Sequence, residues 1–289
     1  MFLVALGIMG YLVYREREVL LTYPWQFRPI PLVLSFVLFS LDLLVVALIW
    51  GWIMNTLSKK IGYREHFRYF TVANVAKRIP GTIWYIASRA QLYHQEGIDY
   101  KLTSLASGME LAISVMSSVL VSLLFGISII LHYSVSPIVL GIAFLLAALL
   151  LHPRVINQFF TWLKVEATPF SYKDIVLWVL AYLFAWILGG ILLFVIGNII
   201  TPISTQHMGY FIGSYGLVSL LTTTLFFSPS NLGISELGLS LLLTNIMPSS
   251  VAVVLALLAR LLIILYEFIW AGLCILFRLS NRHQQSKEG

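Results

Sequence analysis

The sequence predicts an all-α fold: a polytopic helix bundle that spans a membrane and contains two discontinuous or re-entrant half-helices. Of its 289 residues, 60% are hydrophobic and only 10% are charged, and the mean hydropathy is +0.92. A globule of this length cannot hide so much apolar surface, so lipid must be the solvent for much of it. The apolar stretches are continuous and far longer than the alternating segments of about 10 residues found in an outer-membrane barrel, which favours helices.

The first predicted elements set the orientation. Residues 1–14 are apolar but short for a bilayer, and they lack the basic region and cleavage site of a signal peptide. A second span follows Pro29 and Pro31 and ends near Thr56. Residues 59–78 then carry six Lys or Arg against one Glu. The positive-inside rule therefore predicts a multi-pass protein of the cytoplasmic membrane with both termini in the cytoplasm.

The remaining elements follow from alternating apolar and polar segments. Residues 62–76 mix aromatic and charged residues, as an interfacial helix does. Further spans are expected at residues 102–131, from 137 to about 151, at 175–200, at 209–227 and from Pro248 to 277, with a cytoplasmic loop at 152–173 and an external one at 201–207.

Two interruptions of the apolar sequence predict the half-helices, near residues 77–93 and 228–247. Each interruption places a proline, Pro80 or Pro229, with small polar residues ahead of an apolar run that is too short to cross a bilayer. Irregular backbone at membrane depth is tolerated only where protein or a water-filled cavity surrounds it. The two breaks therefore mark the candidate site.

Charged residues follow the two breaks at similar offsets and in opposite order. Arg89 and then Glu110 follow the first break, whereas Glu236 and then Arg260 follow the second. This pattern suggests an inverted structural repeat, with which many secondary transporters build a midplane site. At about 1.5 Å of rise per residue, Glu110 and Arg260 lie near the middle of a hydrocarbon core about 30 Å thick, where a charge needs a partner or a cavity.

The polar residues around Glu110 are expected to face the interior, because Thr103, Ser107, Ser114 and Ser117 share its helical face. The candidate substrate-binding residues are Asp42, Arg78, Arg89, Glu110, Glu236 and Arg260.

Structural roles stay open for several of these residues. Glu110 with Arg260, or Arg89 with Glu236, can instead be structural ion pairs. For Asp42, both a site role and a hydrogen bond to a neighbouring hydroxyl stay open. Glu267 shares a helical face with Arg260 but lies nearer the cytoplasmic end, where its carboxylate can snorkel.

The chemistry of the breaks points to an anionic ligand. Helix N-termini attract anions, and Lys77, Arg78 and Arg89 add positive charge around the first half-helix. A phosphate is therefore the expected ligand.

CxxC, HExxH, GxSxG and Walker patterns are missing from the sequence, and we expect no enzymatic activity, no metal and no cofactor. The basic residues lie in short loops between apolar runs, an ordinary topology signal, so nucleic acid is not an expected partner.

These motifs resemble the lysylphosphatidylglycerol synthase transmembrane-region family, also described as flippase-like integral membrane proteins. The resemblance rests on residues 78–89, Glu110, residues 229–236 and Arg260. It departs from the family pattern P-G-G-L-G-x-x-E at the second break, where Ser230 and Asn231 replace the glycines.

The resemblance implies a translocase that moves an anionic or aminoacylated phospholipid, or a polyprenyl-phosphate-linked lipid, between leaflets. The expected partners are membrane lipids with a phosphate headgroup, which would contact Arg89 and Arg260, and a glycosyltransferase or aminoacyltransferase. Larger relatives carry a soluble aminoacyltransferase domain, whereas residues 1–289 are expected to form a single transmembrane domain without it. The alternative is an accessory membrane subunit that presents a polyprenyl-linked glycan to a separate glycosyltransferase.

Overall fold

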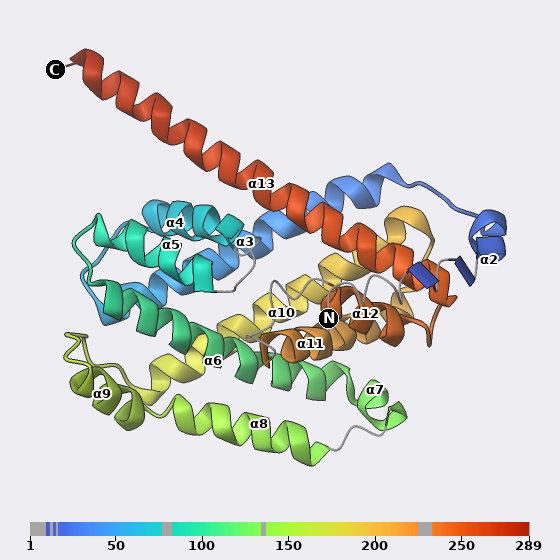
Figure 1. Cartoon of the computed structure of the whole chain (residues 1–289), viewed down its shortest axis with the longest axis horizontal. Helices are drawn as coiled ribbons and strands as arrows, with labels where there is room; N and C mark the ends of the chain where they lie inside the picture. The colour runs from blue at the N-terminus through green and yellow to red at the C-terminus, as the bar shows by residue number, and fades with distance from the viewer. Residues whose placement is uncertain are drawn as a thin grey trace.

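The computed structural model describes residues 10–11, 14–15, 17–76, 83–133, 137–224 and 233–288, and these residues form helices and connections without a strand. Four segments of this part are long and apolar enough to cross a membrane: α3 (Pro29–Leu57), α6 (Tyr100–Phe125), α10 (Tyr172–Ile200) and residues Ser249–Phe277 of α13 (Ser249–Glu288). Figure 1 shows them running along the molecule. The predicted all-α polytopic membrane bundle is confirmed.

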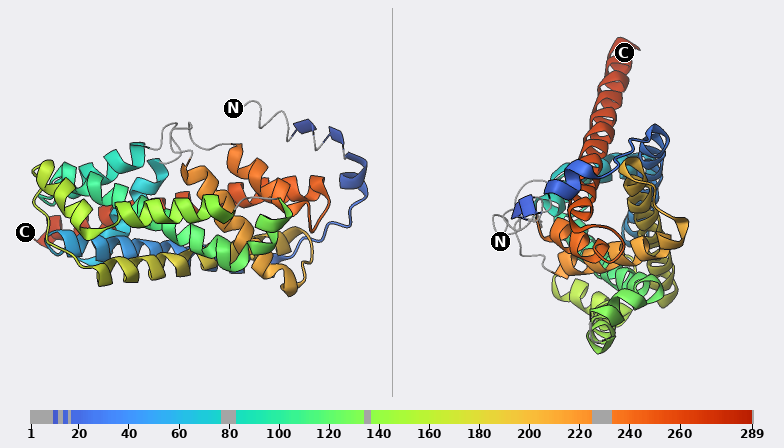
Figure 2. Two further views of the ribbon diagram at one scale, coloured as in Figure 1. Left: turned by 90° about the horizontal axis from the view of Figure 1, so that it is seen from below. Right: turned by 90° about the vertical axis from the view of Figure 1, so that its right-hand side faces the viewer.

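Shorter helices connect and cover the long ones. They are α2 (Arg17–Thr22), α4 (Tyr63–Val75), α5 (Ile83–His94), α7 (Ile127–His132), α8 (Pro137–Leu150), α9 (Pro153–Trp162), the 3₁₀ helix η2 (Thr205–His207), α11 (Met208–Thr224) and α12 (Ile234–Leu243). Helices α4 and α5 lie toward one end of the long axis, and α12 lies toward the other (Figures 1 and 2). The two breaks themselves fall outside the described residues, so the re-entrant arrangement and the inverted repeat stay predictions.

Local sequence signals explain where the long helices begin. The prolines near residue 29 occupy the first turn of α3, where a missing N–H costs no helical hydrogen bond. The side chain of Asp99 caps α6 by accepting a hydrogen bond from the backbone N–H of Lys101 at 2.9 Å. Ser171 and Asp174 form a reciprocal capping box at the start of α10.

Two predicted boundaries are wrong. The span expected over residues 102–131 is interrupted, because α6 ends at Phe125 and Gly126 separates it from α7. The loop expected over residues 152–173 contains α9, which begins at Pro153 and buries Ile156 and Phe160. The short first span expected at residues 1–14 lies mostly outside the described residues.

Glycines allow α6, α10 and α11 to approach closely. A Cβ atom on Gly213 of α11 would lie 2.6 Å from the Cα atom of Gly126, and one on Gly190 of α10 would lie 2.5 Å from the Cα atom of Ile212. Small residues at membrane helix crossings permit such backbone contact. These three helices therefore form a tightly packed frame.

The contact between α13 and α3 is different in kind, because polar side chains help to join these two helices. The hydroxyl groups of Tyr266 and Ser35 lie 2.8 Å apart, and the Trp270 indole N–H donates to the Ser40 hydroxyl at 2.8 Å. The Tyr266 ring also packs against Phe36. Hydroxyl and ring contacts thus hold α13 beside the N-terminal half of α3.

Candidate functional site

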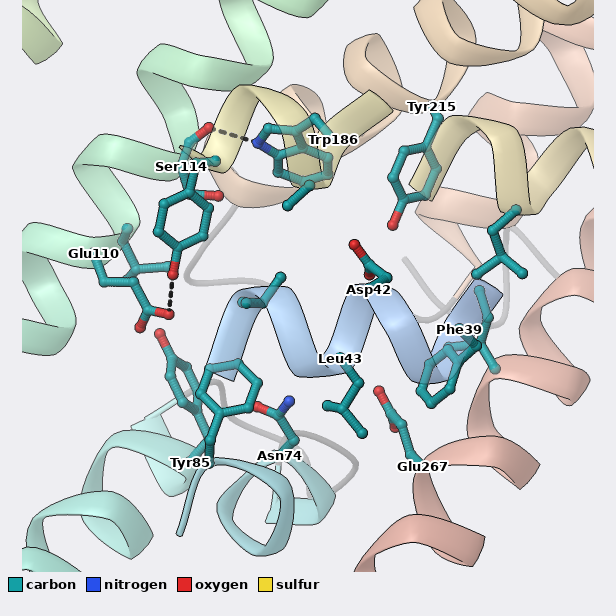
Figure 3. A pocket seen from close by; sticks show the side chains of 17 residues that line it. Phe39, Asp42, Leu43, Asn74, Tyr85, Glu110, Ser114, Trp186, Tyr215 and Glu267 are labelled. Carbon is teal, nitrogen blue, oxygen red and sulfur yellow. Dashed lines mark hydrogen bonds between the residues drawn. The ribbon is translucent and has the colours of Figure 1, made fainter. Parts of the chain in front are cut away.

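A cavity of about 250 Å³ lies inside the bundle, lined by side chains from all four spanning helices and from α4, α5 and α11 (Figure 3). Its charged lining residues in the described part of the chain are Asp42 of α3, Glu110 of α6 and Glu267 of α13. Lys, Arg and His are missing from the described lining. The charged residues that line the cavity in the described part of the chain are therefore all acidic.

Glu110 is held by two partners on neighbouring helices. Its Oε1 atom accepts a hydrogen bond from the Tyr182 hydroxyl of α10 at 2.6 Å. Its Oε2 atom binds the Nη1 atom of Arg89, on α5, in a buried ion pair. A charged acceptor strengthens both contacts, so the Glu110 carboxylate is fixed at the cavity wall.

Arg89 is fully buried behind Glu110 and does not line the cavity. Its guanidinium carbon lies 4.3, 4.5 and 5.1 Å from the ring centroids of Trp50, Phe70 and Tyr85. Aromatic faces attract a cation, and the desolvated setting strengthens this attraction. The rings and Glu110 together explain how a full positive charge is accommodated here.

Asp42 contributes a carboxylate whose charge is not balanced within the described residues. Its Oδ1 atom is shielded from solvent and accepts no hydrogen bond from them. The Asp42 carboxylate and the Tyr215 hydroxyl face the same part of the cavity (Figure 3), and Tyr215 lies within the electrostatic reach of both Asp42 and Glu267.

A buried amide adds a further acceptor. Asn74 of α4 is 7% exposed, lines the cavity, and has an Oδ1 atom without a hydrogen-bond partner in the described structure. Trp186 of α10 donates its indole N–H to the backbone oxygen of Ser114 at 3.0 Å, which fixes its ring. The aromatic lining consists of Phe39, Phe70, Tyr85, Tyr182, Trp186 and Tyr215. Acidic groups, open acceptors and aromatic rings together suit a cation that donates hydrogen bonds.

A second ion pair lies at the start of α12. Glu236 Oε1 is 3.3 Å from Arg260 Nε, and the Arg260 side chain is 24% exposed. Glu236 Oε2 accepts hydrogen bonds from the Gly233 N–H at 2.7 Å and the Ser235 hydroxyl at 2.9 Å. Gly233 has φ +85°, a left-handed conformation that favours glycine. Neither Glu236 nor Arg260 lines the cavity.

The structure brings the predicted residues together in an unexpected pairing. Arg89 binds Glu110 and Glu236 binds Arg260, so each ion pair forms within one motif. The pairs Glu110 with Arg260 and Arg89 with Glu236, considered from the sequence, are therefore wrong. Asp42 meets Glu110 in one cavity, whereas Arg78 lies outside the described residues.

The polar stripe of α6 faces inward as predicted, since Thr103, Ser107 and Ser117 are fully buried. The Ser117 hydroxyl also bonds across to the backbone oxygen of Val179 on α10 at 2.9 Å. Among the polar residues of the cavity wall, sequence reasoning did not single out Asn74, Tyr182, Trp186 and Tyr215. For Glu267 a signal was present, a carboxylate within an apolar span, but it was explained by snorkelling.

Comparison with known proteins identifies the family. The model of the lysylphosphatidylglycerol synthase TM region family matches residues 2–271. The chain belongs to this family. Individual curated proteins gave no match to the chain. Membership of the lysylphosphatidylglycerol synthase TM region family, together with the apolar helices, makes the chain a multi-pass integral membrane protein related to lipid modification or transport. The matched range includes both ion pairs and the whole cavity.

Proposed function

We propose that this member of the family translocates a lipid between leaflets, and that the ammonium group of an aminoacylated phospholipid enters the cavity. The observation that carries the proposal is the lining of the cavity: three carboxylates and six aromatic rings, with no basic residue in the described part. Among an anionic phospholipid, an aminoacylated phospholipid and a polyprenyl phosphate, the aminoacylated phospholipid best complements this lining.

The match between the ammonium group and the cavity rests on charge and on hydrogen-bond acceptors. An ammonium group offers three N–H donors, and the cavity offers Asp42 Oδ1 and Asn74 Oδ1 as acceptors without described partners. A phosphate in the same place would meet only like charges. We therefore expect the phosphate of the lipid to stay outside the cavity, toward the helix N-termini at the breaks.

The size of the cavity supports binding of part of a lipid. About 250 Å³ corresponds to roughly eight water molecules at about 30 Å³ each. This volume suits an aminoacyl headgroup but not the acyl chains, which then remain in the bilayer during transfer. Such a division between a buried headgroup and lipid-embedded tails is what a translocase requires.

The two arginines take a supporting role in this proposal. Arg89 and Arg260 are bound to Glu110 and Glu236, and neither arginine lines the cavity. The proposal assigns transport rather than catalysis, in the cytoplasmic membrane with both termini in the cytoplasm. An aminoacyltransferase would supply the modified lipid.

Leaflet exchange in proteoliposomes tests the proposal. Fluorescent lysyl-phosphatidylglycerol, phosphatidylglycerol and a polyprenyl phosphate are compared by chemical quenching of the outer leaflet. We expect exchange of the lysyl lipid, slowed about tenfold in Glu110→Gln, which is roughly 1.4 kcal/mol. The matched control is Glu166→Gln, an exposed carboxylate away from the cavity, which should exchange like wild type.

Each other outcome has a clear meaning. Exchange of the phosphatidylglycerol alone would contradict the assignment of the cavity to an ammonium group. A folded, monodisperse protein that exchanges none of the three lipids would overturn the translocase proposal. That result would favour an accessory subunit acting with a separate glycosyltransferase.

A further inference from the structure

The starting observation is a difference between two carboxylates in one cavity. Glu110 is neutralised by Arg89, whereas Asp42 lies in an apolar span with no cation among the described residues that line the cavity. An unbalanced carboxylate inside a membrane is unfavourable. Asp42 therefore needs a mobile positive charge whenever the cavity is empty.

The titratable groups facing Asp42 supply no such charge. The other lining helices contribute Tyr85 from α5, Glu110 from α6, Tyr182 from α10, Tyr215 from α11 and Glu267 from α13, and α4 contributes no titratable group. Two of these five groups are carboxylates and three are phenols. None of these five groups carries a positive charge.

Asn74 gives an independent indication of a ligand. This amide is 7% exposed and comes from a different helix, yet its Oδ1 atom also lacks a described partner and borders the same cavity. Buried polar atoms in native proteins are nearly always satisfied. Two open acceptors in one cavity, one charged and one neutral, therefore indicate that a hydrogen-bond donor binds within this cavity.

We propose that Asp42 is the proton-exchanging residue of the transport cycle: it holds a proton while the cavity is empty and releases it when an ammonium headgroup enters. This inference rests on the proposed function. On entry, the O–H bond of Asp42 breaks and the proton passes to water on the side to which the cavity is open. On release of the headgroup, the carboxylate takes a proton from water on the opposite side.

The exchange couples lipid movement to a proton gradient with a definite sign. Proton binding from the acidic side competes with the ammonium group for one carboxylate and releases the headgroup toward that side. The protonated empty site then returns and loses its proton as the next headgroup binds. Protons thus move from the acidic side to the other side of the membrane. The aminoacylated lipid accumulates in the leaflet that faces the acidic side.

Glu110 cannot serve as this group without losing its ion pair. Its two oxygens are engaged by Arg89 and Tyr182, whereas Asp42 Oδ1 has no partner in the described structure. Glu110 instead stays paired with Arg89 at the cavity wall, where its carboxylate oxygens can accept further hydrogen bonds from the ammonium group. The division of labour predicts different phenotypes: Glu110→Gln weakens lipid binding, whereas Asp42→Asn removes the response to pH.

The experiment combines lipid exchange with proton flux in one proteoliposome. A pH-sensitive dye is trapped inside, fluorescent lysyl-phosphatidylglycerol is added, and a gradient of one pH unit is imposed in either direction. Wild type should enrich the lipid several-fold in the leaflet facing the acidic side and show lipid-dependent proton flux. Asp42→Asn should exchange slowly with no enrichment and no flux, and Glu166→Gln should behave like wild type.

A binding measurement distinguishes failure of the inference from failure of the proposed function. Titration of Nα-acetyl-lysine methyl ester, which has one ammonium group, in buffers of different ionisation enthalpy counts the protons released on binding. Wild type should release close to one proton, and Asp42→Asn close to none. Exchange of lipid without a gradient response, or equal proton release by Asp42→Asn, would overturn the coupling but leave the translocase. Absence of both binding and exchange would overturn both proposals.

Discussion

Arg89 on α5 is bound to Glu110 on α6, the next helix along the chain. The same connection recurs between Glu236 on α12 and Arg260 on α13, with the two charges exchanged. The two pairs differ in burial: the Arg89 side chain is 1% exposed and that of Arg260 is 24% exposed. Equivalent pairs in unequal surroundings should contribute unequally to stability.

The first prediction compares the two arginines. Arg89→Met leaves Glu110 as an uncompensated buried charge and should lower the free energy of unfolding by about 3–5 kcal/mol. Arg260→Met leaves Glu236 with its hydrogen bonds from Gly233 and Ser235, and should cost about 1 kcal/mol. Thermal unfolding of the purified proteins in detergent measures both. Equal losses would show that burial does not separate the two pairs.

The second prediction concerns the coupling of Arg89 with Glu110. Adding Glu110→Gln to Arg89→Met removes the uncompensated carboxylate, so the double variant should recover most of the stability lost by Arg89→Met. The amide can still accept the hydrogen bond from Tyr182. A double-mutant cycle of unfolding temperatures gives the coupling, and simple additivity would argue against a direct interaction.

A third prediction tests the frame of α6, α10 and α11. Gly190→Ala places a Cβ atom 2.5 Å from the backbone of Ile212, so the two helices must move apart, at a cost of about 1–3 kcal/mol. Gly108→Ala on α6 is the matched control, since its Cβ atom meets nothing within 4 Å. The control should be neutral or slightly stabilising because alanine favours helix. Similar unfolding temperatures for both variants would contradict close backbone packing.

The fourth prediction is a pH dependence of stability at His66 of α4, which is not among the spanning helices. The ring is fully buried, with Nδ1 2.5 Å from the Tyr93 hydroxyl and Nε2 3.0 Å from Asn55 Oδ1. Burial lowers the pKa of His66 from 6.5 to about 4. The unfolded chain then binds the proton more tightly, so this contribution to stability is complete above pH 6.5 and is lost as pH falls toward 4.

Unfolding temperatures at pH 7.5 and pH 5.0 check this effect. The wild-type protein should lose more stability over this interval than His66→Gln, by up to about 1.4 kcal/mol per pH unit. Other groups titrate equally in both proteins, so the difference isolates His66. An identical pH dependence in the two proteins would show that His66 is protonated equally in the folded and unfolded states.

Hydropathy predicted the spanning helices because a long apolar segment placed in lipid forms a membrane-spanning helix. Helical periodicity also placed the face of α6 correctly, since residues three and four apart must share a side. The depth of a residue in the membrane and its helical face do not reveal which helices are neighbours. The partners of the two ion pairs were therefore predicted wrongly. The inward position of Glu267 was missed for the same reason, because it depends on how α13 crosses α3.

The interruption at Gly126 shows another limit of sequence reasoning. The apolar run from 102 to 131 contains two glycines, Gly108 and Gly126, and since isolated glycines are tolerated inside many helices, neither signals a break. At the break, Gly126 lies against Gly213 on a distant segment, a contact that the sequence does not reveal. Helix α9 was likewise read as a loop, although burial of Ile156 and Phe160 against the bundle stabilises it.

The glycine contacts also determine which helix–helix interface of the molecule separates more easily. Backbones that touch through Gly190 and Gly213 have no room to slide, whereas hydroxyl hydrogen bonds such as Tyr266 to Ser35 exchange partners at a net cost of only about 1 kcal/mol each. The interface between α3 and α13 therefore separates more easily than the glycine contacts do. These two helices carry Asp42 and Glu267. A lipid headgroup that enters laterally from the bilayer, with its acyl chains still in the membrane, would therefore pass between α3 and α13.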